Sequence, residues 1–126
     1  NQMTRKDEIK RYLANHIFTL ETIRLLREQL LVFERLESEG EKFTEAEREF
    51  TIQKLKKYQD LLETAGRLEI GIKLLNTKEN EKDKEIVECI YLYGYSITKT
   101  AQQVGYSESA VKKRLNIIYD KLDKFI

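Results

Sequence analysis

The stretch TAQQVGYSESAVKKRL (residues 100–115) decides the predicted fold of this chain. A small residue, Ala101, lies four positions before Gly105, and Ser107 then begins a run that is apolar on one side and basic on the other. Where two helices cross steeply, the first needs a small residue at the contact, and the turn favours glycine because a positive φ then brings no Cβ clash. Ser107 can accept hydrogen bonds from the free N–H groups that begin the second helix. The pattern predicts a helix-turn-helix.

The apolar residues around this stretch share one inward register. We expect one helix over 97–104, capped by Ser96 and ended by Gly105, and a last helix from Glu108 to the C-terminus. Upstream, EIVECIYLYGY (residues 85–95) predicts a short apolar helix that ends at Gly94, with its tyrosines in the core and at the rim. These three helices form a predicted domain over 85–126. The inward positions of its last two helices are Ile97, Ala101, Val104, Val111, Leu115, Ile118 and Leu122.

The outward face of the last helix carries side chains that can read DNA. Lysine can donate to guanine, asparagine can pair with adenine, and glutamate can accept from cytosine. Residues 96–126 hold six basic and three acidic side chains, although the whole chain has a net charge of only +1. We therefore expect binding to double-stranded DNA; the alternative is a three-helix packing element with a solvated basic face. The expected base contacts are Glu108, Ser109, Lys112, Lys113 and Asn116, and the expected phosphate contacts are Thr98, Lys99, Gln102, Gln103 and Arg114.

Residues 91–122 (YLYGYSITKTAQQVGYSESAVKKRLNIIYDKL) resemble region 4 of bacterial sigma factors and the related LuxR-type DNA-binding domain. The matching features are Gly94, Ser96, Ala101, the GYS turn at 105–107 and the VKKRL run at 111–115. The resemblance implies a DNA-binding recognition helix and makes RNA polymerase a candidate second partner. The KTA at 99–101 departs from the family pattern, which usually carries an acidic and a branched apolar residue before the alanine.

The N-terminal part predicts a long antiparallel helical hairpin over residues 4–75. Apolar residues recur every three or four positions over 4–38, which predicts one continuous helix. The polar ESEGEKF (residues 37–43) predicts a turn, and TEAE (residues 44–47) is a capping box that begins a second helix over 44–75. The spacing of the second stripe is near the coiled-coil repeat, and both stripes are wider than a two-helix seam needs. We therefore expect a further partner, either the C-terminal helices or a second copy of the chain; the alternative is a solvated spacer. Residues 76–84 read as a solvated polar linker, which completes an all-α fold.

Composition excludes several other functions. Cys89 is the single cysteine, so no internal disulfide can form, and it is most simply a small buried apolar residue. The single histidine, His16, lies within the apolar register of the first helix, where we expect a seam or flank residue. We expect no metal site, cofactor, catalytic residues or membrane span. Met3 is a candidate for the native first residue, with Asn1 and Gln2 preceding it.

These features favour a cytoplasmic, sequence-specific DNA-binding regulator of transcription and not an enzyme. We expect no counterpart of the region with which full sigma factors melt promoters. A long helical segment before a sigma-like domain resembles small phage regulators of late genes, the RinA and ArpU type, which implies phage or prophage origin. Because one small helix-turn-helix covers few bases, we expect a homodimer through the N-terminal helices. Two alternatives stay open: a phage DNA-packaging subunit of the small-terminase type, and a module that binds RNA polymerase or another regulator.

Overall fold

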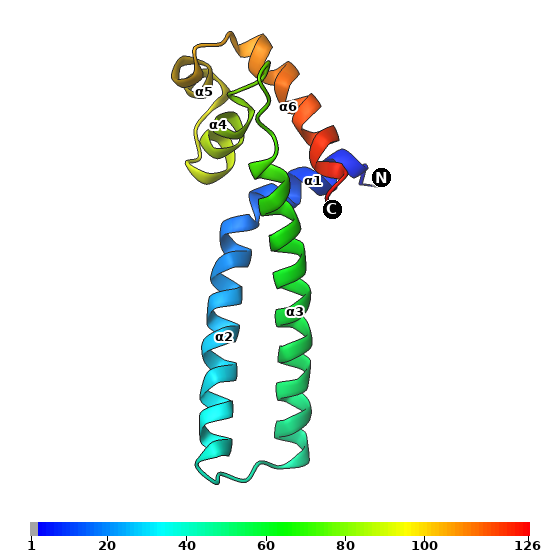
Figure 1. Ribbon diagram of the computed structural model, residues 1–126, viewed down its shortest axis with the longest axis vertical. Helices are drawn as coiled ribbons and strands as arrows, with labels where there is room; N and C mark the ends of the chain where they lie inside the picture. Colours follow the sequence, from blue (N-terminus) through cyan, green and yellow to red (C-terminus); the bar gives the residue numbers. More distant parts are fainter. Residues whose placement is uncertain (1–2) are drawn as a thin grey trace. The chain divides into compact units, whose positions relative to one another are not determined.

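The computed structural model describes residues 3–126, and within this range the chain forms helices and no strand, which confirms the all-α class (Figure 1). Asn1 and Gln2 lie outside the described residues. The chain divides into two compact units: unit 1 combines the segment up to His16 with Gly66–Ile126, and unit 2 is Ile17–Ala65. The helices are α1 (Arg5–Ala14), α2 (His16–Ser38), α3 (Glu45–Lys73), α4 (Asp83–Val87), the π-helical turn η1 (Glu88–Leu92), α5 (Ile97–Val104) and α6 (Glu108–Asp123).

The prediction of one continuous helix over 4–38 is wrong at Asn15. This residue ends α1 with φ −95° and ψ 1°, outside the helical region, and its N–H still bonds to the carbonyl of Arg11. Asparagine competes with the helix by bonding nearby backbone groups, which makes it a favourable place for a break. Ile9 and Leu13 before the break are buried in unit 1. The first ten-residue helix is therefore part of unit 1, together with the helix-turn-helix.

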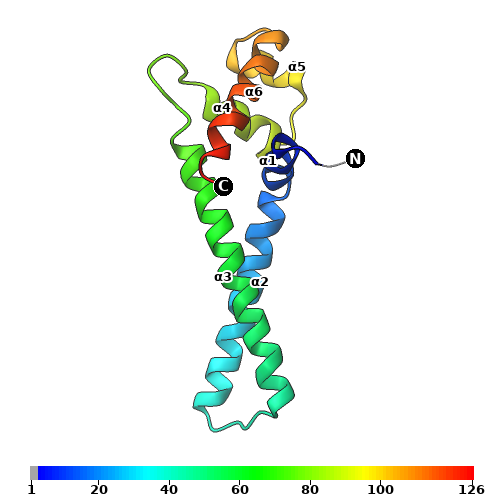
Figure 2. The same ribbon diagram turned by 90° about the vertical axis from the view of Figure 1, so that its right-hand side faces the viewer.

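Unit 1 has a single apolar core built from both ends of the sequence. In Figure 2, α1 lies beside the end of α6, and the two helices are in direct contact. Gly71 permits α3 to approach α6 closely, because a Cβ there would lie 2.9 Å from the Cδ2 atom of the buried Leu122. The core residues are Ile9, Leu13, Leu68, Leu75, Ile86, Val87, Ala101, Val104, Val111, Leu115, Ile118, Tyr119 and Leu122.

The segment 76–84, expected to be a solvated linker, is bonded into unit 1. The Oδ1 atom of Asn76 accepts from the N–H of Lys84 at 2.9 Å, and the ammonium of Lys82 donates to the carbonyl of Val104 at the end of α5. Asp83, the first residue of α4, is only 1% exposed. The expectation of a solvated segment fails at Asp83, because its carboxylate has cationic partners on α6 that offset its burial.

Unit 2 contains most of α2 and the first part of α3, which run in opposite directions and are joined through residues 39–44 (Figure 1). The capping box at the start of α3 is present: the N–H of Glu47 donates to Thr44 Oγ1 at 3.1 Å, and the N–H of Thr44 donates to Glu47 Oε1 at 3.0 Å. Ile23, Leu26 and Ala65 are its buried apolar residues. Large apolar side chains that stay exposed are Ile17, Phe18, Leu20, Leu25, Leu31, Val32, Phe50, Ile52, Leu55 and Leu62.

Candidate nucleic-acid interface

The turn between α5 and α6 has the geometry that its sequence predicts. Gly105 ends α5 in the left-handed region with φ +78°, and its N–H bonds to the carbonyl of Ala101. Ser107 caps α6 by accepting from the N–H of Ala110 at 3.1 Å. Ser96 caps α5 in the same way, accepting from the N–H of Lys99 at 3.0 Å. These caps fix the residue at which each helix begins. The start of α6 in turn sets which of its side chains face the core and which face outward.

The two faces of α6 differ sharply. Val111, Leu115, Ile118 and Leu122 are buried in the core of unit 1. The five residues expected to contact bases all have exposed side chains, namely Glu108, Ser109, Lys112, Lys113 and Asn116. Among the described residues, Lys112 and Lys113 have no hydrogen-bonding or ion-pair partner, so both ammonium groups are available to a ligand. Glu108 and Asn116 do have partners within unit 1.

Four of the five residues expected to contact phosphates lie exposed on or beside the outer face of α5: Thr98, Lys99, Gln102 and Gln103. The hydroxyl of Thr98 donates to Glu108 Oε1 at 2.7 Å, which links the start of α5 to the start of α6. The ammonium of Lys99 lies 4.0 Å from the ring centroid of Tyr95, at the distance of a cation–π contact. The two helices thus present one polar surface on either side of the turn.

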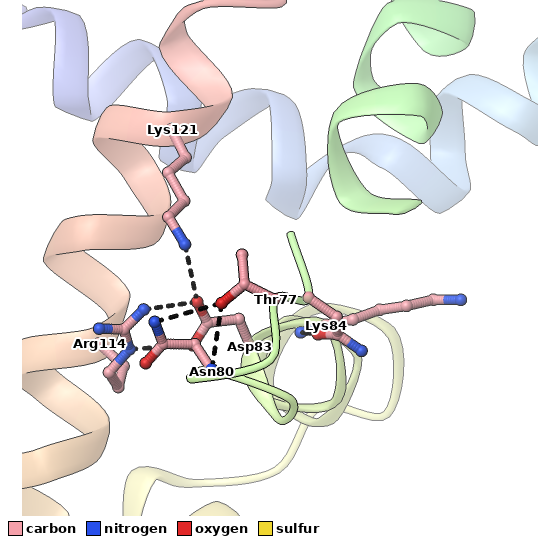
Figure 3. Close-up of polar contacts among 7 residues, drawn as sticks. Thr77, Asn80, Asp83, Lys84, Arg114 and Lys121 are labelled. Carbon is pink, nitrogen blue, oxygen red and sulfur yellow. Dashed lines mark hydrogen bonds and ion pairs between the residues drawn. The ribbon is translucent and has the colours of Figure 1, made fainter. Parts of the chain in front are cut away.

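Arg114, the fifth expected phosphate contact, is placed differently. Its guanidinium makes two hydrogen bonds to the carboxylate of Asp83, at 3.0 Å from Nε and 2.6 Å from Nη2 (Figure 3). Lys121 reaches the same carboxylate from one side at 3.3 Å (Figure 3). The hydrogen bond to Asp83 raises the pKa of Arg114, whose side chain is only 18% exposed. Arg114 therefore ties α6 to the start of α4 and is directed away from solvent.

Two lysines of α1 lie beside the exposed face of α6, where sequence periodicity did not place them. The ammonium of Lys6 donates to Asn116 Oδ1 at 2.5 Å. The ammonium of Lys10 lies 5.5 Å from the ring centroid of Tyr119 on α6. Local sequence carries no signal for this contact, because Lys6 and Asn116 are 110 positions apart. The exposed surface around α6 thus includes basic residues from outside the helix-turn-helix.

Tyr119 also bonds to Tyr91 on η1, and the two hydroxyl oxygens are 2.5 Å apart. Burial raises the pKa of both hydroxyls, so both stay protonated at neutral pH. One hydroxyl donates to the other within the pair, which leaves one O–H free to donate elsewhere.

The single histidine and the single cysteine, which could otherwise serve as a metal ligand or a nucleophile, are both buried. His16 is buried, with Nε2 3.5 Å from Glu69 Oε1. Cys89 is buried, and that burial raises the pKa of its thiol. Residues 3–126 contain no group of three His, Cys, Asp or Glu side chains that could hold a metal ion. No helix in this range combines the length and the apolar character that crossing a membrane requires.

Comparison with known proteins points to one family. Neither the curated proteins nor the solved structures include one that matches the chain. The family model described as ECF sigma factor matches residues 40–125, a range that includes α5, the turn and α6. The match agrees with the sigma region 4-like pattern of the turn and its caps. Because the matched range covers more than half of the chain, the chain belongs to the ECF sigma factor family, whose members are DNA-binding transcription factors.

Proposed function

We propose that the chain is a sequence-specific regulator of transcription that reads the DNA major groove with α6. The observation that carries the proposal is the two-sided character of this helix, with one face in the core of unit 1 and the other exposed and basic. Ser109, Lys112 and Lys113 are exposed in its N-terminal half, the part that enters the groove in helix-turn-helix proteins. Lysine ammonium groups that lack a protein partner can donate to guanine O6 and N7.

In this proposal α5 crosses the DNA backbone. Lys99, Gln102 and Gln103 supply phosphate contacts, which position the protein but carry no sequence information. Thr98 and Glu108 bond to each other and hold the two helix starts together. Glu108 keeps a second carboxylate oxygen that can accept from cytosine N4. We do not propose Arg114 as a phosphate contact, because its guanidinium faces Asp83.

The test compares two double variants with equal loss of charge. Lys112→Ala/Lys113→Ala removes the exposed lysines of α6, whereas Lys56→Ala/Lys57→Ala removes two adjacent exposed lysines of α3 in unit 2. A DNA site is first selected from a random duplex pool with the wild-type chain, and binding is then measured by fluorescence anisotropy. We expect the α6 variant to lose at least ten-fold in affinity, on the order of the discrimination that one base contact supplies. Equal affinities for the two variants would refute the groove assignment.

We further propose that unit 2 mediates self-association into a homodimer. Phe18 is 74% exposed and Phe50 is 59% exposed, in a unit that leaves most of its large apolar side chains uncovered. Large apolar side chains left exposed in this number favour an interaction surface. A dimer would let two recognition helices bind two half-sites, which raises both affinity and specificity.

Sedimentation of the full chain tests the dimer and separates the remaining alternatives. We expect a dimer that Phe18→Ser/Phe50→Ser converts to a monomer with unchanged helix content, since both residues are exposed. Ring-sized oligomers would favour a phage DNA-packaging subunit. Weak, salt-insensitive DNA binding would favour a module that contacts RNA polymerase or another regulator, because phosphate contacts produce a salt dependence. A regulator of phage origin, of the RinA and ArpU type, would act in the cytoplasm of its bacterial host.

A further inference from the structure

A surface pocket of about 440 Å³ lies beside α6 in unit 1. Its polar lining comes from α1, η1 and α6 and includes Tyr91 and Tyr119, whose hydroxyls bond to each other. The lining residues are Lys10, Ile90, Tyr91, Ile97, Lys112, Leu115, Asn116 and Tyr119. Two of them, Lys112 and Asn116, belong to the face of α6 expected to contact bases.

The lining offers donors and cations but no carboxylate. Lys10 and Lys112 contribute two ammonium groups. The tyrosine pair has one O–H left to donate, and the amide of Asn116 keeps its Nδ2 donors because Lys6 occupies only its Oδ1 atom. Ammonium groups together with neutral donors suit a compact oxyanion such as a phosphate. The pocket is therefore complementary in charge to an anionic ligand.

The location of the pocket beside α6 points to the DNA backbone as the source of such a phosphate. Lys112 lines the pocket and also belongs to the exposed basic face of α6, so a ligand in the pocket lies next to whatever that face binds. When a helix occupies the major groove, phosphates of the DNA backbone lie at both edges of it. We propose that α1 provides a DNA-backbone contact outside the helix-turn-helix, in which Lys10 and the Tyr91–Tyr119 hydroxyl pair bind one phosphate beside α6. This inference rests on the proposed function.

The decisive experiment compares Lys10→Ala with Arg11→Ala. Both changes remove one positive charge from an exposed residue of α1, but Arg11 does not line the pocket. Arg11 is two positions from the buried Ile9, about 200° around the helix, and so faces away from the core. Binding to a 30-base-pair duplex of random sequence is measured by anisotropy over a range of NaCl concentrations. We expect Lys10→Ala to reduce the slope of log K against log salt by about 0.9, and Arg11→Ala to leave it unchanged.

Three outcomes have distinct meanings. An unchanged slope for Lys10→Ala, while Lys112→Ala/Lys113→Ala still weakens binding, overturns this inference and leaves the proposed function intact. If neither variant changes DNA binding, the proposed function itself fails. Stronger binding by Lys10→Ala also overturns the inference, because α1 would then shield the face of α6.

Two further experiments test whether the ligand is a phosphate of the DNA backbone. Tyr91→Phe/Tyr119→Phe keeps both rings and removes both hydroxyls, and we expect weaker binding with an unchanged salt slope, since no charge is lost. On the selected duplex, a single methylphosphonate at the contacted position should weaken the wild-type chain but not Lys10→Ala. If Lys10→Ala instead changes only the binding of inorganic phosphate, the pocket takes a free anion and the DNA contact is refuted.

Discussion

Replacing Asp83 with asparagine should destabilise unit 1 strongly, although Asp83 lies in a segment with the composition of a linker. The carboxylate is 1% exposed and accepts from Arg114 at 3.0 and 2.6 Å and from Lys121 at 3.3 Å. Removing one partner from a buried ion pair costs about 3–5 kcal/mol, because the other charge stays buried without compensation. The side chains of Arg114 and Lys121 are 18% and 31% exposed and can turn partly to water. We therefore expect Asp83→Asn to lower the free energy of unfolding by about 2–3 kcal/mol, at or below the low end of that range.

Urea unfolding followed by circular dichroism measures this loss. With a slope of about 1.5 kcal/mol per molar urea, the unfolding midpoint of Asp83→Asn should fall by about 1.5 M. Asp120→Asn is the matched control, since it removes an exposed carboxylate from α6 and should change stability by less than about 0.5 kcal/mol. In a double-mutant cycle with Arg114→Gln, we expect the two changes to be coupled by at least about 1 kcal/mol. A midpoint shift no larger than that of the control, or additive effects in the cycle, would refute the reasoning.

Arg114→Gln also tests where the guanidinium of Arg114 points when DNA is bound. Because it faces Asp83, Arg114→Gln should lower stability yet leave the salt slope of DNA binding at the wild-type value, measured where both chains are fully folded. A slope reduced by about 0.9 would show that Arg114 contacts a phosphate in the complex.

Substitutions at three other positions test the packing and the helix capping of unit 1. Gly71→Ala should destabilise by about 1 kcal/mol in urea, because the overpacking against Leu122 outweighs the gain in helix propensity; a higher unfolding midpoint would contradict the close approach of α3 and α6. Thr100→Val should raise the melting temperature, because the fully buried hydroxyl of Thr100 has no hydrogen-bond partner among the described residues. Ser107→Ala should lower stability by about 1 kcal/mol and Ser107→Asp should restore it, since either side chain can cap α6.

The helix-turn-helix was predictable because its determinants are local. Gly105 needs a positive φ for the turn, Ser96 and Ser107 cap the helices that follow them, and the apolar spacing sets which face of α6 is buried. Each of these features depends on residues within one or two turns of helix. For this reason α5 begins and ends at the predicted residues, and the outer face of α6 carries the exposed lysines.

The features that the sequence did not reveal depend on distant partners. At Asn15 the asparagine itself is the only local signal of a break, and it is a weak one, because the apolar spacing continues from Leu13 into α2 without proline or glycine. The burial of Asp83 requires Arg114, 31 positions away, and Arg114 by itself resembles another exposed base on α6. Lys10 enters the candidate site only because α1 packs on α6. The sequence thus predicts which face of a helix carries a charged residue. Which residue it contacts, and therefore its role, depends on the tertiary fold.

The contacts of Arg5 have a consequence for how the chain folds during synthesis. Its guanidinium pairs with Asp123 and donates to the backbone oxygen of Ile126, 118 and 121 positions further on. Unit 2 lies between the two segments of unit 1 in sequence and can fold from near neighbours while translation continues. The docking site of α1 does not exist until α6 has left the ribosome exit tunnel, so Ile9 and Leu13 stay uncovered until then. A nascent chain halted before α6 should therefore be protease-sensitive in α1 and more resistant in unit 2.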